Sequence, residues 1–438
     1  ARGRAAALRP ARPRAALPGG AALQRPTGAM QPTDEAWRSL DDLDLAEELR
    51  HPVPTLQDVP PFMRAAVRGA LTLALDRLRA TYESGAGEGF EAAARAWKLF
   101  LLAPRMLLAR TQFRGSQGRA VLLERAAAFR RGDWTRLLAE ARAGQPSVRP
   151  EVPDLPPELA TERLRERACA SVRKGEVSRA RHILTSADLA PGTAATWASL
   201  TNPARRPAEP RSAVPDDVLS HRPSELPQLR TDAVAGALRD SRRGCAPGLS
   251  GMRAEHLKLL LQDAQAMELV AYAATRLARA EVPATVARGI AMARLTALSK
   301  PDGGVRGIAT GDVFRRLVSR TLAKQWAGVF DRATHPFQFA LQAGAGTDAL
   351  AAHVRTALSL RRDAVVVSLD GRSAYDSISR AAFLTKLREV APSLLPFVRL
   401  FYGQASAYLW WDADGNCREV PQGEGCEQGD PLAPALYA

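Results

Sequence analysis

The segment that most constrains this chain of 438 residues is a short apolar run that ends in a carboxylate, Ala364-Val-Val-Val-Ser-Leu-Asp370. Several β-branched residues in a row predict a strand, so the Asp370 carboxylate should lie at the end of a sheet. A carboxylate in that position is a ligand suited to Mg²⁺, which proteins often hold with one or two carboxylates and the substrate's phosphates. Asp370 could instead cap the following turn or helix. The segment by itself leaves both interpretations open.

Residues 229–438 are predicted to form an α+β domain, because helical and strand patterns alternate there. Turn-forming residues divide the predicted strands into hairpins, with Pro301-Asp-Gly-Gly304 in the first and Asp412-Ala-Asp-Gly415 in the second. Asp312 is expected to cap the helix that follows the first hairpin. The predicted strands are 293–300, 305–309, 364–370, 405–411 and 417–421, and the predicted helices are 232–239, 254–261, 313–330 and one that begins after Gln428-Gly-Asp-Pro-Leu432.

The residues before this domain divide into three segments. Residues 33–145 carry apolar side chains at helical spacing without an alternating strand pattern, which predicts a mostly α-helical N-terminal region. Residues 146–228 hold two proline-rich stretches and a short helical pair, which is typical of a linker. Residues 1–32 form a basic segment rich in Ala, Arg and Pro, with six arginines before Met30, and we expect this segment to be disordered.

The charge of the chain favours a polyanionic partner. Lys and Arg number 61 against 46 Asp and Glu, which gives a formal net charge of +15. Arginine greatly outnumbers lysine, and its planar guanidinium matches phosphate in a bidentate fashion. Nucleic acid is therefore the first candidate, ahead of an anionic membrane surface. The alternative is a basic surface that only keeps the protein in solution.

The cysteines and the hydropathy pattern exclude several classes of protein. The four cysteines form no CxxC pair and have no histidine nearby at zinc-finger spacing, which indicates reduced thiols and no disulfide framework or zinc site. No apolar run approaches the ~20 residues that a membrane-spanning helix needs. We expect a nuclear or cytoplasmic protein without a membrane partner, and the sequence leaves its oligomeric state open.

Four motifs follow one another in the second half of the chain. They are Ala246-Pro-Gly-Leu-Ser-Gly251, Leu298-Ser-Lys-Pro-Asp-Gly-Gly-Val-Arg-Gly-Ile-Ala309, Val367-Ser-Leu-Asp-Gly-Arg-Ser-Ala-Tyr-Asp376 and Gln422-Gly-Glu-Gly-Cys-Glu-Gln-Gly-Asp-Pro-Leu432. Together they resemble the reverse-transcriptase domain of non-long-terminal-repeat (LINE-type) retroelements and of group II introns. The resemblance covers roughly residues 230–438. It implies a right-hand polymerase, with fingers and part of a palm, after the helical N-terminal region.

The resemblance also implies a metal site and a sugar-selecting side chain. Asp370 matches the family's metal-binding aspartate of the first palm motif, and the Gly371 carbonyl is a possible further ligand. Tyr375 matches the aromatic residue whose ring occupies the space that a ribose 2′-hydroxyl would need. A bulky ring there favours deoxynucleotides, although Tyr375 could also be a core residue.

Four further residues match the family's nucleotide-binding positions. Arg306 matches the fingers arginine that holds the triphosphate, and Lys300 is a looser match for the accompanying lysine. Gln428 and Gly429 match the motif that packs under the incoming nucleotide and the template. Lys300 and Arg306 could instead be solvated charges on an exposed hairpin, and Gln428 could cap the last helix.

The chain departs from the family pattern at two places. Gly307 stands where family members usually have proline, which loosens a strand but leaves the neighbouring charge. The family's remaining metal aspartates belong to a Tyr/Phe-x-Asp-Asp hairpin after the Gln-Gly-Asp-Pro helix, and the sequence ends at Ala438 without it. We therefore expect a fragment with an incomplete two-ion Mg²⁺ site, inactive by itself.

The predicted function is RNA-directed DNA polymerisation. A complete protein of this kind would extend a DNA primer on an RNA template, with deoxynucleoside triphosphates and Mg²⁺. One alternative is a non-catalytic nucleic-acid-binding descendant of a polymerase, and the missing motif supports this alternative. Another alternative is an RNA-dependent RNA polymerase. Tyr375 argues against it, because a bulky ring beside the sugar disfavours ribonucleotides.

Overall fold

A computed structural model describes residues 32–84, 89–144, 156–173, 175–185, 187–341 and 345–438. The predicted basic segment at 1–32 therefore lies outside the described residues except for its last residue, as does the start of the proline-rich stretch at 145–155. Within the described ranges, every helix is too short or too polar to cross a lipid bilayer.

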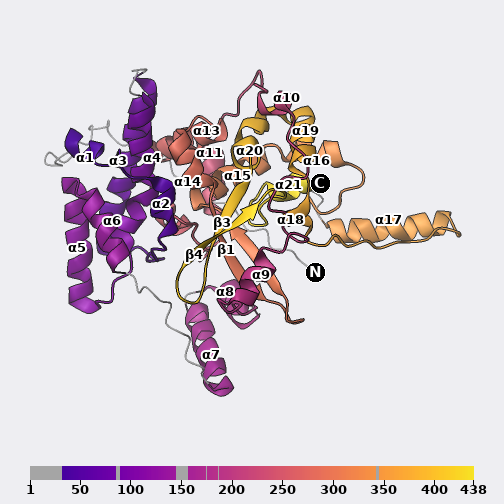
Figure 1. Cartoon of the computed structure of the whole chain (residues 1–438), viewed down its shortest axis with the longest axis horizontal. Coiled ribbons are helices and arrows are strands. Elements are labelled where there is room, and N and C mark those ends of the chain that lie inside the picture. Colours follow the sequence, from indigo (N-terminus) through magenta and orange to yellow (C-terminus); the bar gives the residue numbers. More distant parts are fainter. Residues whose placement is uncertain (1–31, 85–88, 145–155, 174, 186, 342–344) are drawn as a thin grey trace, which may run out of the picture.

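The described residues from Asp34 to Ala143 form a helical layer at one side of the molecule (Figure 1). Helices α3 and α4 pack along one another in this layer. The side chains of α4 are buried on nearly every side, which explains its almost continuous apolar sequence. The helices are α1 (Asp34–Arg38), α2 (Leu45–Arg50), η1 (Pro61–Met63), α3 (Arg64–Glu83), α4 (Gly89–Leu108), α5 (Gly115–Arg131) and α6 (Trp134–Ala143).

The residues between this layer and the predicted polymerase domain contain short helices joined by extended chain. Helix α9 packs against the sheet of the second half, because Leu200 and Trp197 contact its aromatic residues. These helices are α7 (Pro157–Arg173), α8 (Val177–Thr185), α9 (Ala194–Leu200) and α10 (Asp216–Leu219).

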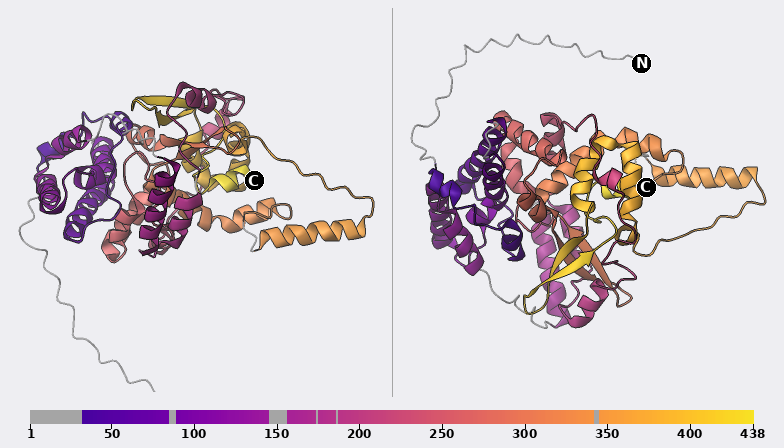
Figure 2. Two further views of the ribbon diagram at one scale, coloured as in Figure 1. Left: turned by 90° about the horizontal axis from the view of Figure 1, so that it is seen from below. Right: turned by 45° about the horizontal axis from the view of Figure 1, so that its top comes forward.

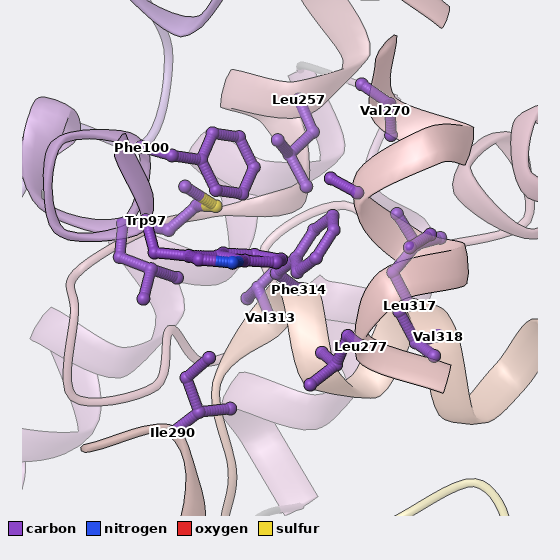
Figure 3. Close-up of a cluster of buried hydrophobic side chains, with 14 of the residues drawn as sticks. Trp97, Phe100, Leu257, Val270, Leu277, Ile290, Val313, Phe314, Leu317 and Val318 are labelled. Carbon is purple, nitrogen blue, oxygen red and sulfur yellow. The ribbon is translucent and has the colours of Figure 1, made fainter. Parts of the chain in front are cut away.

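A second group of helices packs directly on the N-terminal layer. Phe314 is fully buried, and its ring lies 4.9 Å from that of Phe100 and 5.8 Å from that of Trp97. Figure 3 shows these rings meeting side chains of the second group, so one core joins the two layers. The helices of this group are α11 (Thr231–Arg239), α12 (Ala254–Leu257), η2 (Lys258–Leu260), α13 (Ala264–Ala278), α14 (Ala284–Ala291), α15 (Val313–Gln325) and α16 (Ala327–Thr334).

The sheet has the strand order β2-β1-β3-β4, and both predicted hairpins are confirmed. The first and second hairpins join where β1 and β3 run parallel, over the pairs Ala293–Tyr408 and Arg294–Leu409. Asp312 caps α15 as predicted, since its Oδ1 accepts a hydrogen bond from the Phe314 amide at 2.8 Å. The strands are β1 (Ala293–Ser299), β2 (Val305–Thr310), β3 (Ser406–Trp411) and β4 (Cys417–Gln422).

The predicted strand at 364–370 is wrong. The segment joins no strand of the sheet, and Val365, Val367 and Leu369 are between 71% and 90% exposed. It follows α17 (Gly346–Leu360), which buries no residue and projects from the body of the molecule (Figures 1 and 2). Strand propensity measures how side chains fit a pleated, half-buried surface, and the described chain offers this segment neither a neighbouring strand nor a packed face.

The remaining helices follow this segment. They are α18 (Ala374–Ser377), α19 (Arg380–Val390), η3 (Pro392–Leu394), α20 (Leu395–Tyr402) and, at the end of the chain, α21 (Ala433–Tyr437).

Phe314→Ala should lower the free energy of unfolding by about 3–5 kcal/mol, because it leaves a cavity between two helical layers. Phe113, which is 47% exposed, provides the control: Phe113→Ala should change the same quantity by at most about 0.5 kcal/mol. Urea denaturation followed by tryptophan fluorescence measures both. Equal losses in the two variants would contradict the role given to Phe314.

Candidate functional site

One cavity of about 760 Å³ brings together most of the residues that the sequence singles out. Its walls come from the β1–β2 hairpin, from the turn around α18, and from the chain after α9. Gly429 is the predicted site residue that does not line it. The lining residues are Ser199, Leu200, Arg205, Arg206, Lys300, Val305, Arg306, Gly307, Asp370, Gly371, Arg372, Ser373, Ala374, Tyr375, Asp376 and Gln428.

The two carboxylates of the cavity have different surroundings. Asp376 is half-buried and pairs with Arg206, whose Nη2 lies 3.0 Å from its Oδ1. Asp370 is exposed and forms no ion pair with any residue that the structure describes. The Asp370 carboxylate therefore has no counterion among the described residues, and Gly371 lines the cavity beside it.

This donor set fits a single Mg²⁺ ion that arrives with a phosphate-bearing substrate. Mg²⁺ commonly takes one or two carboxylates from the protein and the rest of its ligands from phosphates and water. In the described part of the chain, no three His, Cys, Asp or Glu side chains cluster closely enough to hold a metal. Asp376 already pairs with Arg206, so Asp370 is the carboxylate of this cavity without an ion-pair partner among the described residues.

Basic side chains occupy the other walls of the cavity. Lys300 follows β1, and Arg306 projects from β2 as an exposed side chain. Besides Arg206, which pairs with Asp376, sequence analysis missed two other cations at this site, Arg205 and Arg372. Apart from Arg206, none of these cations forms an ion pair within the described ranges. The cavity therefore has an excess of positive charge suited to phosphate groups.

The segment predicted as a linker is part of the site. The Ser377 hydroxyl donates to the Arg205 carbonyl at 3.2 Å, and the Gly423 amide donates to the Pro207 carbonyl at 2.8 Å. The Arg211 amide donates to Glu424 Oε1 at 2.7 Å. This stretch therefore ties the turn around α18 to the loop after β4. The adjacent arginines Arg205 and Arg206, between Pro203 and Pro207, were the feature of the sequence that could have indicated a role at the site.

A glycine allows the loop after β4 to pack on the backbone beside Tyr375. The amides of Gly425 and Cys426 donate to the carbonyls of Ile378 and Tyr375, each at 2.8 Å. Gly425 has a φ of +81°, and a Cβ there would lie 2.4 Å from the Tyr375 oxygen. Only glycine fits this position, and its contacts hold Tyr375 and Gln428 at the same cavity.

Gly429 packs closely against β2 at the edge of the site. A Cβ at this position would lie 2.7 Å from the Ala309 carbonyl oxygen in β2. The absence of a side chain lets the Gln428 bend approach the hairpin that carries Arg306. Gly429 itself does not line the cavity.

Tyr375 forms part of the cavity wall and packs against a second tyrosine in a tilted arrangement. Its ring centroid lies 5.2 Å from that of Tyr437, with 32° between the ring planes. Burial raises the pKa of Tyr375, and Cys426 and Tyr437 raise it further. The phenol is therefore neutral at physiological pH.

A buried network of charges lies beneath the Gln428 bend. Arg315 of α15 donates to Glu427 at 2.7 Å, and its Nη2 lies 3.5 Å from Asp430. Tyr402 donates to Asp430 at 3.0 Å, and Ser319 donates to the other oxygen of this carboxylate at 2.5 Å. Burial raises the pKa of Glu427, and the Arg315 charge acts in the opposite direction. The network fixes both ends of the bend.

Comparison with known proteins agrees with the motifs in this site. Residues 298–438 match the family described as reverse transcriptase (RNA-dependent DNA polymerase). The retrotransposable element SLACS 132 kDa protein of Trypanosoma brucei gambiense is 30% identical over 204 residues, which are 45% of this chain. The match covers 16% of that relative's length. Residues 298–438 are therefore similar to a reverse transcriptase domain, and the chain is similar to part of a retrotransposon protein.

Arg315→Met should lower the free energy of unfolding by about 3–5 kcal/mol at neutral pH, because it leaves buried carboxylates without their counterion. Without Arg315, the pKa of Glu427 rises further above its unfolded value. Because a carboxyl with a raised pKa favours the fold in its protonated form, the loss should shrink as the pH falls toward the ordinary Glu range of about 4–5.

Denaturation series at several pH values measure this effect. Arg320→Met on the same helix is the control, since Arg320 is half-buried and donates to Ser241 Oγ. It should have a small effect with little dependence on pH. An Arg315→Met loss that is constant from neutral to acidic pH would contradict the proposed role of the Glu427 charge.

Proposed function

We propose that this chain forms the nucleotide- and template-binding part of an RNA-directed DNA polymerase of a LINE-type retrotransposon. The observation that carries the proposal is that Asp370 and Tyr375, which belong to one motif, meet Gln428 of another motif in one basic cavity. The match of residues 298–438 to the reverse transcriptase family, which includes these three residues, also supports the proposal. In this proposal the body of the chain is a right-hand polymerase with fingers and part of a palm.

The basic wall of the cavity is proposed to hold the triphosphate of the incoming nucleotide. Arg306 and Lys300 approach from the β1–β2 hairpin, and Arg205 approaches from the chain after α9. Arginine donates two parallel hydrogen bonds to phosphate oxygens, and these are stronger than bonds between neutral groups. The lack of ion-pair partners among the described residues leaves these side chains available.

The Asp370 carboxylate and the Gly371 carbonyl are proposed to ligate the Mg²⁺ ion that accompanies this triphosphate. The ion would neutralise charge on the phosphates during nucleotidyl transfer. Asp376 is proposed to serve structure, because its ion pair with Arg206 fixes the turn that carries Tyr375. Tyr375 is proposed to exclude the 2′-hydroxyl of ribonucleotides.

We further propose that the 438 residues bind nucleotide and template but do not polymerise by themselves. The second metal ion of nucleotidyl transfer needs further carboxylates near Asp370, and the described cavity offers only the paired Asp376. The same observation favours a second candidate, a non-catalytic nucleic-acid-binding descendant of a polymerase. A measurement of nucleotide binding with and without Mg²⁺ separates the two candidates. Binding that depends on Mg²⁺ supports the polymerase, because a descendant without catalysis does not need the ion.

Arg306→Ala should weaken binding of Mg²⁺–dNTP to the 438-residue chain by about tenfold or more, since one charge-assisted phosphate contact contributes about 1.5–3 kcal/mol. Titration calorimetry measures the affinity. Arg68→Ala, which removes an exposed arginine from α3, is the control and should leave the affinity unchanged. Wild-type preference for NTPs over dNTPs, or equal affinity in the Arg306→Ala variant, would refute the assignment.

Asp370→Asn should remove most of the gain in dNTP affinity that Mg²⁺ provides, a loss of about tenfold or more, because a neutral amide ligates this ion poorly. Affinity for template RNA should stay the same. Asp302→Asn makes the same change of charge on the neighbouring hairpin turn and keeps the oxygen that accepts from the Gly304 amide. If this control variant loses as much of the gain as Asp370→Asn does, Asp370 is not a specific ligand.

A further inference from the structure

A second basic recess, of about 900 Å³, lies on the opposite face of the sheet from the nucleotide cavity. Tyr408 of β3 faces the cavity side, because the Arg206 guanidinium lies over its ring and Leu200 packs with it. Ala407, the next residue, lines the recess together with Glu419, whose partner in β3 is Leu409 on the same face as Ala407; Ser406 at the start of β3 lies at the edge of the strand and also lines it. Neighbouring residues of a strand point to opposite faces, so the two hollows are separated by the sheet.

The recess has an apolar floor and an arginine-rich rim. Its floor includes side chains of α14 and α20 and the residues next to them, among them Val282, Met292 and Phe401. Four arginines line it, and Glu419 is the one acidic residue among the lining side chains described. They are Arg50, Arg222, Arg288 and Arg399.

Two of these arginines, Arg222 and Arg399, donate to the same His221 carbonyl, at 3.4 and 3.1 Å. Arg399 is half-buried, and its Nη1 donates to the carbonyls of Val218, Leu219 and His221. These bonds fix the guanidinium in place and leave its other nitrogens free to donate. Burial lowers the pKa of Arg399, and the charge of Arg222 lowers it further. An anion between the two side chains would relieve this repulsion.

The other charged side chains of the recess do not neutralise its excess of positive charge. Glu419 already pairs with Arg50, which also contacts Glu47. Arg288 is exposed on α14 and has no ion-pair or hydrogen-bond partner in the ranges that the structure covers. The rim therefore presents Arg222, Arg288 and Arg399 to an anionic ligand.

We propose that this recess binds the sugar-phosphate backbone of a nucleic-acid strand outside the nucleotide cavity. The inference rests on the proposed function, because it assigns a second contact surface to the same nucleic-acid-binding protein. Arginines around an apolar floor suit a strand whose phosphates meet guanidinium groups while a sugar or base covers the floor. A concave recess does not fit a flat membrane surface, whereas a flexible single strand can enter it.

The test uses the 438-residue chain and a short fluorescent single-stranded RNA, with DNA of the same sequence in parallel. Arg222→Ala/Arg288→Ala should weaken strand binding by about a hundredfold or more, since it removes two charge-assisted phosphate contacts. The slope of log affinity against log salt should fall by about 1.4, since each phosphate contact on a single strand contributes about 0.7. Losses for both strands indicate recognition of the shared backbone, and a loss for one strand alone identifies the strand that the recess holds.

Arg64→Ala/Arg68→Ala is the matched control, because it removes two exposed arginines from α3. An equal loss in this control would overturn the proposal, because it would show that only total charge matters. Unchanged strand binding in the Arg222→Ala/Arg288→Ala variant would also overturn it. Mg²⁺–dNTP affinity of that variant should stay at the wild-type value. This second measurement separates failure of the recess from failure of the proposed nucleotide site.

Discussion

The buried ion pair between Arg315 and Glu427 is the interaction on which the geometry of the site depends. Arg315 belongs to a helix that packs into the main core through Phe314, and Glu427 directly precedes Gln428. A charge pair excluded from water tolerates little displacement, because each partner left alone in the interior is strongly unfavourable. The position of the Gln428 bend is thereby coupled to the packing of the helical layers.

The sequence predicted the parts of this structure that local chemistry determines. Both hairpins formed where turn residues separate strand patterns, and Asp312 capped its helix as expected. The helix predicted at 313–330 instead ends at Gln325 and a new one begins at Ala327. Six of the predicted site residues line one cavity and Gly429 does not, while the roles that the family resemblance implies for them stay predictions; the six are Lys300, Arg306, Asp370, Gly371, Tyr375 and Gln428.

What the sequence did not predict depends on contacts between distant segments. The apolar run before Asp370 has strand composition, but whether it joins a sheet is decided by a neighbouring strand, which composition does not report. Arg205 lies in a proline-rich stretch whose path across the site follows from hydrogen bonds to Ser377 and Gly423. The pairing of Arg315 with Glu427, 112 positions apart, likewise has no local signal.

The unpaired segment before Asp370 has a consequence for how this carboxylate is anchored. On its C-terminal side, the Cys426 amide bonds to the carbonyl of Tyr375, five residues after Asp370. On the N-terminal side, exposed chain leads back to a projecting helix. Any strand that paired with this segment would restrict the range of positions open to Asp370. Cation affinity and strand pairing would then be thermodynamically linked, each strengthening the other by the same factor.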